Sequence, residues 1–517
     1  MSRFARFRRP LAVALLSSVL VGCSASTAST DRVDEALPEL TAFYDQKLDY
    51  GSCAGFATTD RDVKAFANKQ LQCARLTVPL DYGNPKGRTI QLGVLKVAAT
   101  GEPKGSLVVN PGGPASSGMS FAAQLKDFKG YPRIARQFDV VGFDMRGTGA
   151  STPSVDCLTD AERRNDLLMA INLFGGETWT ENETRRVAAS CADGSGGADV
   201  ISHLGSRDTA RDMDLLRAVL GDEQLNYFGF SYGTRLGAVY AQTFPGKVRT
   251  MVLDGAMDPR LGIEKRMVDQ YAGFQQAFDA LATDCARAAG CPLGTDPAKA
   301  TSRFQQLVRP LLDRPLPVGT DRRLTYRGAV EAVLFGLYHS TDWPTVVKAL
   351  TELAAGQGRT LLAIRDGAHE LQADGRYTNM LEGAFATHCN DRERLSPQQE
   401  TAMRRQMQAA APFLDDGRNR QARDICEHWP AGPSLTYPYV TDTDGLPPTL
   451  VVSVTGDPAS PHQHGIGLAK TLGAGLLTVD GKQHGAALVA GNDCVDSIVA
   501  TYLIDAKAAP ADAHCAL

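Results

Sequence analysis

Short apolar runs that end in turn residues alternate with helical patterns along most of this 517-residue chain. Four runs read as buried strands that stop at glycine or proline, namely SLVVNPGG, FDVVGFDMRG, LNYFGFSYG and VRTMVLDGAMDP. Two earlier runs, ARLTVPLDY and TIQLGVLKVAA, form a hairpin-like pair, and RDTARDMDLLRAVLG has helical spacing. The alternation predicts an α/β fold with a mostly parallel sheet flanked by helices.

A long helical block interrupts this rhythm, and strands return afterwards with PTLVVSVTGDPASP and GLLTVDGKQHG. The block is a predicted insertion that caps the sheet domain. We therefore expect a first part of the core at residues 41–259, a largely helical cap or lid at 260–440, and a second part of the core at 441–517.

The N-terminus has the features of an export signal. MSRFARFRRP contains four arginines and no acid, the apolar stretch LAVALLSSVL follows, and LVGC ends at Cys23. This resembles a bacterial lipoprotein signal, so residues 1–22 are a predicted signal peptide, Cys23 the lipidated residue and 23–40 a flexible tether. An ordinary secretory peptide or a short anchor is the alternative. The expected location is extracytoplasmic, on the membrane through a lipid anchor.

Charge and cysteine content agree with that compartment. The net charge of −4 and the lack of basic blocks argue against nucleic acid as a partner. Besides Cys23 the chain has ten cysteines, an even number that favours disulfides in an exported protein. Sequence alone does not fix their connectivity, but they fall into neighbouring pairs, and the pairs we predict are Cys53–Cys73, Cys157–Cys191, Cys285–Cys291, Cys389–Cys426 and Cys494–Cys515. Since neither CxxC nor HxxxH occurs, we expect no metal site and no cofactor.

Ser231 lies in GFSYG, at the predicted junction between a strand and a helix. A GxSxG turn at such a junction projects the serine hydroxyl above the sheet, whereas the pentapeptide elsewhere is often only a tight turn. A serine nucleophile also needs a base, because its hydroxyl is protonated at neutral pH.

In folds of this kind the acid and the histidine follow the serine along the chain. His484 follows the last predicted strand in a glycine-flanked turn, and Asp457 follows the strand before it. We therefore predict His484 as the base and Asp457 as its acid. Asp254, after the strand VRTMVLD, is the competing acid. If Asp457 is the acid, Asp254 would secure the turn where the insertion begins.

Acyl transfer also needs donors for the oxyanion. One expected donor is the backbone N–H of Tyr232, directly after the nucleophile, and the other comes from the loop NPGGPASSG. Pro114 has no N–H, so Gly113 is the predicted second donor. A plain glycine-proline turn is the alternative for this loop.

Together, NPGGPASSG, GFDMRGTGAS, GFSYGTRLG, TGDPASP and the QHG turn resemble the secreted tripeptidyl aminopeptidases of actinobacteria, α/β-hydrolase serine peptidases related to proline iminopeptidases. The resemblance spans nearly the whole mature chain. It implies Ser231, Asp457 and His484 as the triad, a helical cap, and release of short peptides from free N-termini. Ala115 departs from the family's GGPG turn, which would alter the acyl pocket, and QHG replaces the commoner GHG.

An aminopeptidase must bind an ammonium with an acidic group. ATHCNDRER resembles the family's cysteine-x-acid motif, so Asp391 is the candidate, and an exposed loop aspartate is the alternative. The expected protein is a lipid-anchored serine peptidase that releases short peptides, with tripeptides as the expected product. We take a monomer as the default state. An esterase or lipase using the same triad is one alternative, and a non-catalytic peptide-binding lipoprotein is another.

Overall fold

The computed structural model describes residues 38–164, 179–510 and 512–517. The chain divides into two units, Met1–Arg32 and Val33–Leu517, and every described residue belongs to the second. Cys23 and the predicted signal peptide lie outside the described residues, so lipidation stays a prediction. None of the helices within the described ranges is long and apolar enough to cross a membrane.

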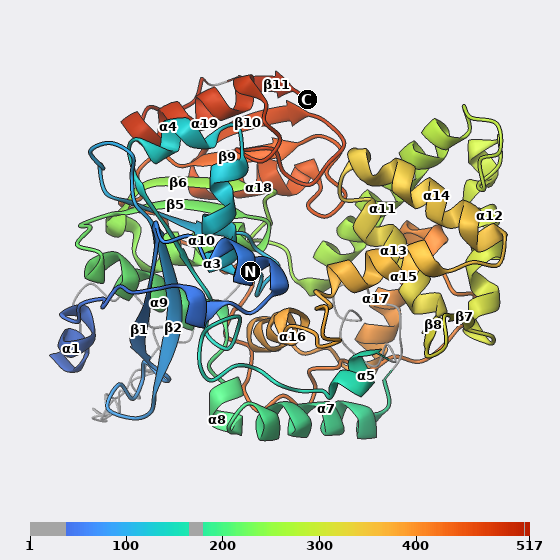
Figure 1. The fold of residues 1–517 in the computed structure, drawn as a ribbon, viewed down its shortest axis with the longest axis horizontal. Helices are drawn as coiled ribbons and strands as arrows, with labels where there is room; N and C mark the ends of the chain where they lie inside the picture. The colour runs from blue at the N-terminus through green and yellow to red at the C-terminus, as the bar shows by residue number, and fades with distance from the viewer. Residues whose placement is uncertain (1–37, 165–178, 511) are drawn as a thin grey trace, which may run out of the picture. The chain divides into compact units, whose positions relative to one another are not determined.

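A large mixed sheet forms the centre of the fold (Figure 1). Among the described residues it has nine strands in the order β1-β2-β4-β3-β5-β6-β9-β10-β11. Their bounds are β1 Leu71–Pro79, β2 Thr89–Val97, β3 Ser106–Asn110, β4 Asp139–Phe143, β5 Leu225–Phe230, β6 Val248–Asp254, β9 Leu450–Val454, β10 Gly475–Asp480 and β11 His514–Ala516. The pairs β1–β2 and β2–β4 are antiparallel, and the other pairs are parallel. The predicted mostly parallel sheet is confirmed.

Strand register brings the loops that carry the candidate site to one edge of the sheet. Asn110 at the end of β3 is level with Gly229 near the end of β5, and Phe230 is level with Asp254 at the end of β6. Since parallel strands end at a common edge, the loops after β3, β5, β9 and β10 converge there. The edge strand β11 was not predicted, because three residues are too few to show a periodic pattern.

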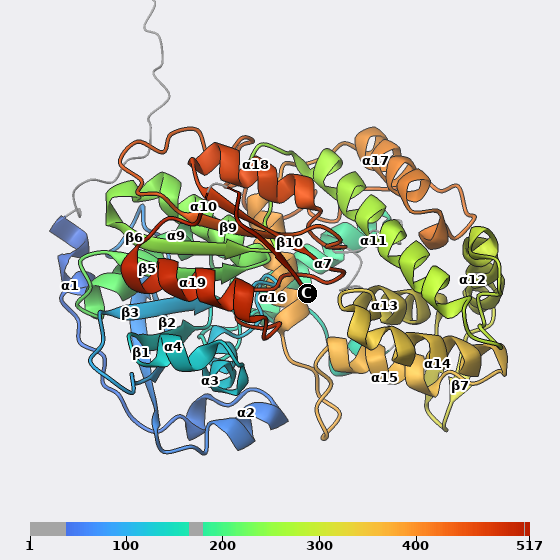
Figure 2. The same cartoon turned by 90° about the horizontal axis from the view of Figure 1, so that it is seen from above.

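Helices cover both faces of the sheet, as the sequence predicts (Figure 2). One face packs against α9 (Ser206–Val219), α10 (Tyr232–Thr243) and α18 (His462–Leu472), and the other against α3 (Gly118–Gln124), α4 (Tyr131–Ala135) and α19 (Asp493–Asp505). Two short helices, α1 (Thr41–Tyr44) and α2 (Asp60–Ala65), precede the sheet. Each face therefore has its own apolar core, which holds the strands level beneath the site.

A helical lobe lies between β6 and β9, as the long helical pattern predicts (Figure 1). It contains α11 Ile263–Cys285, α12 Ala300–Val308, α13 Tyr326–Gly336, α14 Trp343–Ala354, α15 Arg359–Ala368, α16 Met380–Asp391, α17 Pro397–Ala410 and a small hairpin of β7 Leu316–Val318 and β8 Arg322–Leu324. Most of these helices share a core of their own, in which the ring of Phe278 stacks 4.5 Å from that of Phe413.

A second helical segment is inserted between β4 and β5, and the sequence analysis did not predict where it packs. Its helices are α5 (Asp160–Arg164), α7 (Glu181–Gly194) and α8 (Ala198–Ile201). Residues of this segment share an apolar cluster with α16, and Val187, Phe385 and Trp429 all belong to it. Part of the predicted first core segment, residues 41–259, thus shares its apolar contacts with a cap helix, and the boundary between core and cap stays a prediction.

Five disulfides close loops in the described chain, and they join the pairs that the spacing predicts: Cys53–Cys73, Cys157–Cys191, Cys285–Cys291, Cys389–Cys426 and Cys494–Cys515. Two of them, Cys157–Cys191 and Cys389–Cys426, lie in the cluster around α16. Multiple disulfides are typical of proteins that fold outside the cytoplasm.

Candidate active site

Ser231 occupies the sharp turn between β5 and α10, with φ 55° and ψ −119°. A serine at positive φ is held in a strained conformation, and the turn is fixed by a hydrogen bond from its N–H to the Asp254 carbonyl, 2.7 Å long. Its glycine neighbours are required for close packing, because a Cβ at Gly229 would lie 2.5 Å from the Gly233 carbonyl oxygen. The sequence GFSYG thus folds as the strand-to-helix turn that it predicts.

His484 and Asp457 form a buried pair beside this turn. The Nδ1 atom of His484 lies 2.9 Å from each carboxylate oxygen of Asp457. The backbone N–H groups of Ala459 and Ser460 and the Ser460 hydroxyl also donate to that carboxylate. A carboxylate can only accept, so Nδ1 carries the proton and Nε2 has the free lone pair that a base needs.

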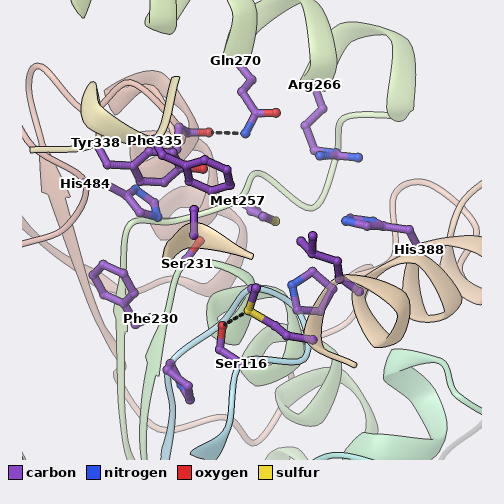
Figure 3. Close-up of a pocket in the computed structure, with 18 of the residues that line it drawn as sticks. Ser116, Phe230, Ser231, Met257, Arg266, Gln270, Phe335, Tyr338, His388 and His484 are labelled. Carbon is purple, nitrogen blue, oxygen red and sulfur yellow. Dashed lines mark hydrogen bonds between the residues drawn. The ribbon is translucent and has the colours of Figure 1, made fainter. Parts of the chain in front are cut away.

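Nε2 of His484 is buried and has no hydrogen-bond partner among the described residues. Ser231 and His484 line the same cavity, and Figure 3 shows the two side chains next to each other on one wall. Burial alone would lower the pKa of His484, but the charge and hydrogen bond of Asp457 outweigh it and raise that pKa above its ordinary value. Such a shift is typical of a base paired with an acid.

Asp254, the competing acid, has a different position. One of its carboxylate oxygens accepts the N–H groups of Ala486 and Ala487, at 2.8 and 2.7 Å. Burial raises its pKa to about 7, partly offset by these two hydrogen bonds. The expectation that Asp254 secures the start of the insertion is wrong, since it holds the loop that directly follows His484.

The loop after β3 packs directly against the serine turn. A Cβ at Gly112, where φ is +89°, would lie 2.4 Å from the Phe230 carbonyl oxygen and 2.9 Å from Cβ of Ser231. Gly113 lines the cavity and precedes a cis peptide bond to Pro114. No hydrogen bond within the described part of the chain uses the N–H of Gly113 or Tyr232. Both N–H groups are therefore without a partner in the described chain, as an oxyanion donor must be, and their role stays a prediction.

Ala115 does not line this cavity. It is buried with φ +76°, and a Cβ on Gly383 of α16 would come within 2.9 Å of the Ala115 Cβ. The side chain lines a neighbouring cavity of about 190 Å³ instead. The expectation that this departure from GGPG alters the acyl pocket is therefore not supported, because the methyl group points towards α16.

The cavity at Ser231 has a volume of about 350 Å³ and lies between the sheet edge and the cap. From the cap, α11 and α16 contribute Met267, Leu381 and Ala384 to an apolar wall, together with Arg266 and His388. Among the described residues that line it there is no aspartate or glutamate. The pocket is thus apolar with basic groups, a composition suited to holding an acyl chain.

Asp391, the predicted ammonium ligand, does not reach this cavity. Its side chain is fully buried at the end of α16, where it accepts hydrogen bonds from the N–H and hydroxyl of Ser206 and the hydroxyl of Ser434. Arg235 lies 3.8 Å away. The prediction is wrong because Ser206 begins α9, and the positive end of that helix takes up the carboxylate.

Sequence reasoning missed the cap residues that touch the catalytic loop. The Tyr338 carbonyl accepts the His484 N–H at 2.8 Å, and the Tyr338 ring lies 5.3 Å from the imidazole in an edge contact. Next to it, the N–H of Ser340 donates to the Lys482 carbonyl. The segment around Tyr338 has only a helical apolar pattern, so no local motif could have indicated these contacts.

The described residues hold one group with metal-ligand spacing, Glu181, Glu427 and His428. Glu181 already pairs with Arg185 and Glu427 with Arg423. None of the three lines the Ser231 cavity. The groups at Ser231 are those that a serine hydrolase uses: a hydroxyl on a sharp turn, an imidazole paired with a carboxylate, and backbone N–H groups.

A serine hydrolase with an α/β architecture is the class of protein that this combination of turn, base and sheet defines. The chain belongs to the alpha/beta hydrolase family, whose profile matches residues 105–488. It is 37% identical over 519 residues to serine protease Hip1 of Mycobacterium tuberculosis, which covers 98% of this chain and 96% of that protein. It is 38% identical over 523 residues to carboxylesterase B of the same organism, covering 98% and 99%. Tripeptidyl aminopeptidase of Streptomyces lividans is 30% identical over 469 residues, covering 87% and 84%.

Proposed function

We propose that this protein is an exported, lipid-anchored serine peptidase that releases short peptides, with tripeptides as the expected product, from free N-termini. In this mechanism Ser231 attacks the scissile carbonyl, His484 takes the proton and returns it to the leaving amine, and Asp457 orients the imidazole. The N–H groups of Gly113 and Tyr232 hold the oxyanion.

The observation that carries the catalytic part is the unpartnered Nε2 of His484 in the cavity that Ser231 also lines. The peptidase part is supported by two relatives that match over most of their length and whose names denote peptidases. A cavity of about 350 Å³ under a helical cap accommodates a few residues rather than a folded protein.

An esterase is the second candidate, because the cavity wall is largely apolar and carboxylesterase B is as similar as the peptidases. The requirement for a free N-terminus comes from the resemblance alone. No carboxylate from the described residues lines the cavity, so the pocket offers no acidic partner for an ammonium. Substrate tests must therefore measure amide cleavage, ester cleavage and the need for a free N-terminus separately.

The deciding experiment compares a tripeptide arylamide with its N-acetylated twin and with a simple arylester. Ser231→Ala serves as the blank, with an expected loss on the order of 10⁶-fold in kcat. We expect the free tripeptide arylamide to be cleaved and its acetylated twin to resist. Equal cleavage of both arylamides would remove the free-amine requirement, and cleavage of the ester alone would establish the esterase instead.

A further inference from the structure

Arg266 is a buried guanidinium without an acidic partner, and it lies in the cavity that contains Ser231. It projects from α11 and has an exposed fraction of only 6%. Its Nε is buried with no hydrogen-bond partner, and no ion pair joins the guanidinium to any described residue. Figure 3 shows Arg266 extending from its helix into the cavity, on the side away from His484.

The carboxylates near this end of the cavity are occupied by other arginines. Asp391 lies near Arg235, while Asp424 and Glu400 pair with Arg392. Glu400 is further shared with Arg404. The buried acids therefore balance the neighbouring cations and leave the charge of Arg266 uncompensated.

Two further arginines and a histidine surround Arg266. Burial and the nearby charges of Arg235 and Arg392 lower the pKa of Arg266 to about 10, which still leaves it charged at neutral pH. His388 of α16 lines the same end, and its buried Nε2 has no hydrogen-bond partner among the described residues. Burial and the adjacent arginines hold the pKa of His388 well below its usual range, so the neutral ring is available as a hydrogen-bonding group.

A buried charge without a partner is energetically costly unless a ligand of opposite charge pairs with it. A guanidinium presents paired N–H donors that match a carboxylate. We infer that Arg266, with His388 beside it, forms a subsite for a carboxylate of the substrate. This inference rests on the proposed hydrolase function of Ser231 and adds the substrate class: short acyl compounds that carry a negative charge.

That carboxylate has two sources, an acidic side chain or the free C-terminus of a short peptide. Three competitors distinguish them: N-acetylglutamate α-amide has only the side-chain carboxylate, N-acetylglutamine has only the terminal one, and N-acetylglutamine amide has neither. Each is tested for slowing the labelling of Ser231 by a fluorophosphonate on the full chain. The variants are Arg266→Gln, the charge-retaining Arg266→Lys, and Lys265→Gln, which removes an adjacent charge that is 63% exposed on the same helix.

We expect at least one monoacid to protect Ser231 at a concentration about tenfold lower than the neutral amide. Arg266→Gln should abolish this difference, Arg266→Lys should keep part of it, and Lys265→Gln should keep all of it. Equal protection by the three compounds, no protection by any, or an unchanged preference in Arg266→Gln would overturn the inference.

Folding and the proposed function are checked separately. Thermal unfolding of Arg266→Gln should begin no lower than in the parent, because the variant loses an unpaired buried charge. If the fluorophosphonate fails to label the folded parent, the proposed function fails, and calorimetric titration of the same three compounds then decides whether the carboxylate subsite exists.

Discussion

Both carboxylate oxygens of Asp457 lie 2.9 Å from Nδ1 of His484. Asp254 lies in the same buried region, yet its hydrogen bonds go to the backbone of Ala486 and Ala487. The two aspartates therefore contact different parts of one loop: Asp457 contacts the imidazole and Asp254 contacts the chain that follows it. This division of contacts separates the expected effects of their replacement.

Asp457→Asn should lower kcat on the order of 10⁴-fold, because an amide at this position favours the wrong tautomer of His484. Asp254→Asn should retain most of the activity, since an amide oxygen can still accept the two backbone N–H groups. Steady-state kinetics on the preferred arylamide or ester measure both variants. The reverse order of losses would make Asp254 the triad acid.

The pH profile of kcat/KM should show an acid limb. Burial opposes protonation of His484, but the charge of Asp457 prevails and raises the pKa above its ordinary value of 6.5. Only the neutral imidazole can act as a base, so activity is lost as the pH falls through this raised pKa. The apparent pKa should drop in Asp457→Asn. A parent profile with its acid limb well below 6.5 would contradict the pairing.

Asp254 should make the parent less stable as the pH rises. Its pKa is raised from 3.8 to about 7, so the folded state binds a proton that the unfolded state releases across this window. The stability contributed by the bound proton is present at low pH and is lost as the pH rises towards 7. The Asp254→Asn variant has no carboxyl group to titrate here, so it does not lose stability in this way. Urea unfolding between pH 3.8 and 7 should show that the free energy of unfolding of the variant rises relative to that of the parent as the pH increases. If the free energies of unfolding of the two proteins change in parallel with pH, the expectation is refuted.

Gly485→Ala should disturb the base itself. Gly485 has φ +72°, and a Cβ there would lie 1.9 Å from Cε2 of Phe230, whose ring packs 5.0 Å from the His484 ring. We expect lower kcat and a loss of stability of about 2 kcal/mol or more. Gly473→Ala is the matched control, because its φ is +61° but nothing lies within 4 Å of the added Cβ. If both variants keep equal activity, the contact with Phe230 is unimportant.

Removing the Cys389–Cys426 disulfide should affect both stability and catalysis. The bond links cysteines 37 residues apart, so its loss should lower the free energy of unfolding by about 4 kcal/mol. It also anchors α16, which lines the cavity, so its loss should lower activity as well. Removing Cys285–Cys291, with a separation of 6, should cost about 2 kcal/mol and leave kinetics unchanged. Thermal melts and kinetics of the two double alanine variants test this difference.

The sequence was most informative where function depends on local geometry. The turn at Ser231 and the loop ends at Asp457 and His484 follow from strands that stop at glycine or aspartate, so a short window contains the whole signal. Neighbouring cysteines likewise indicated their own pairs, since close cysteines meet easily when the intervening loop is short.

The sequence failed where a position depends on how helices pack. Asp391 matched a motif, but the direction of α16 turns its carboxylate towards Ser206 and away from the cavity. Arg266 on α11 and Tyr338 just after α13 reach the site from segments whose pattern indicates only which face of a helix is apolar. Such contacts depend on the angle between distant segments, which no single window of sequence contains.

The position of α16 has a practical consequence for laboratory evolution. Every residue from Leu381 to Asp391 is buried, so any replacement on its cavity side must also suit the neighbours on its other sides. On α11, Gln270 lines the cavity and is only partly buried, whereas Met267 beside it belongs to the apolar core of the cap. Libraries that aim at a new substrate range should therefore begin at Gln270, where a changed side chain leaves the packing of its helix intact.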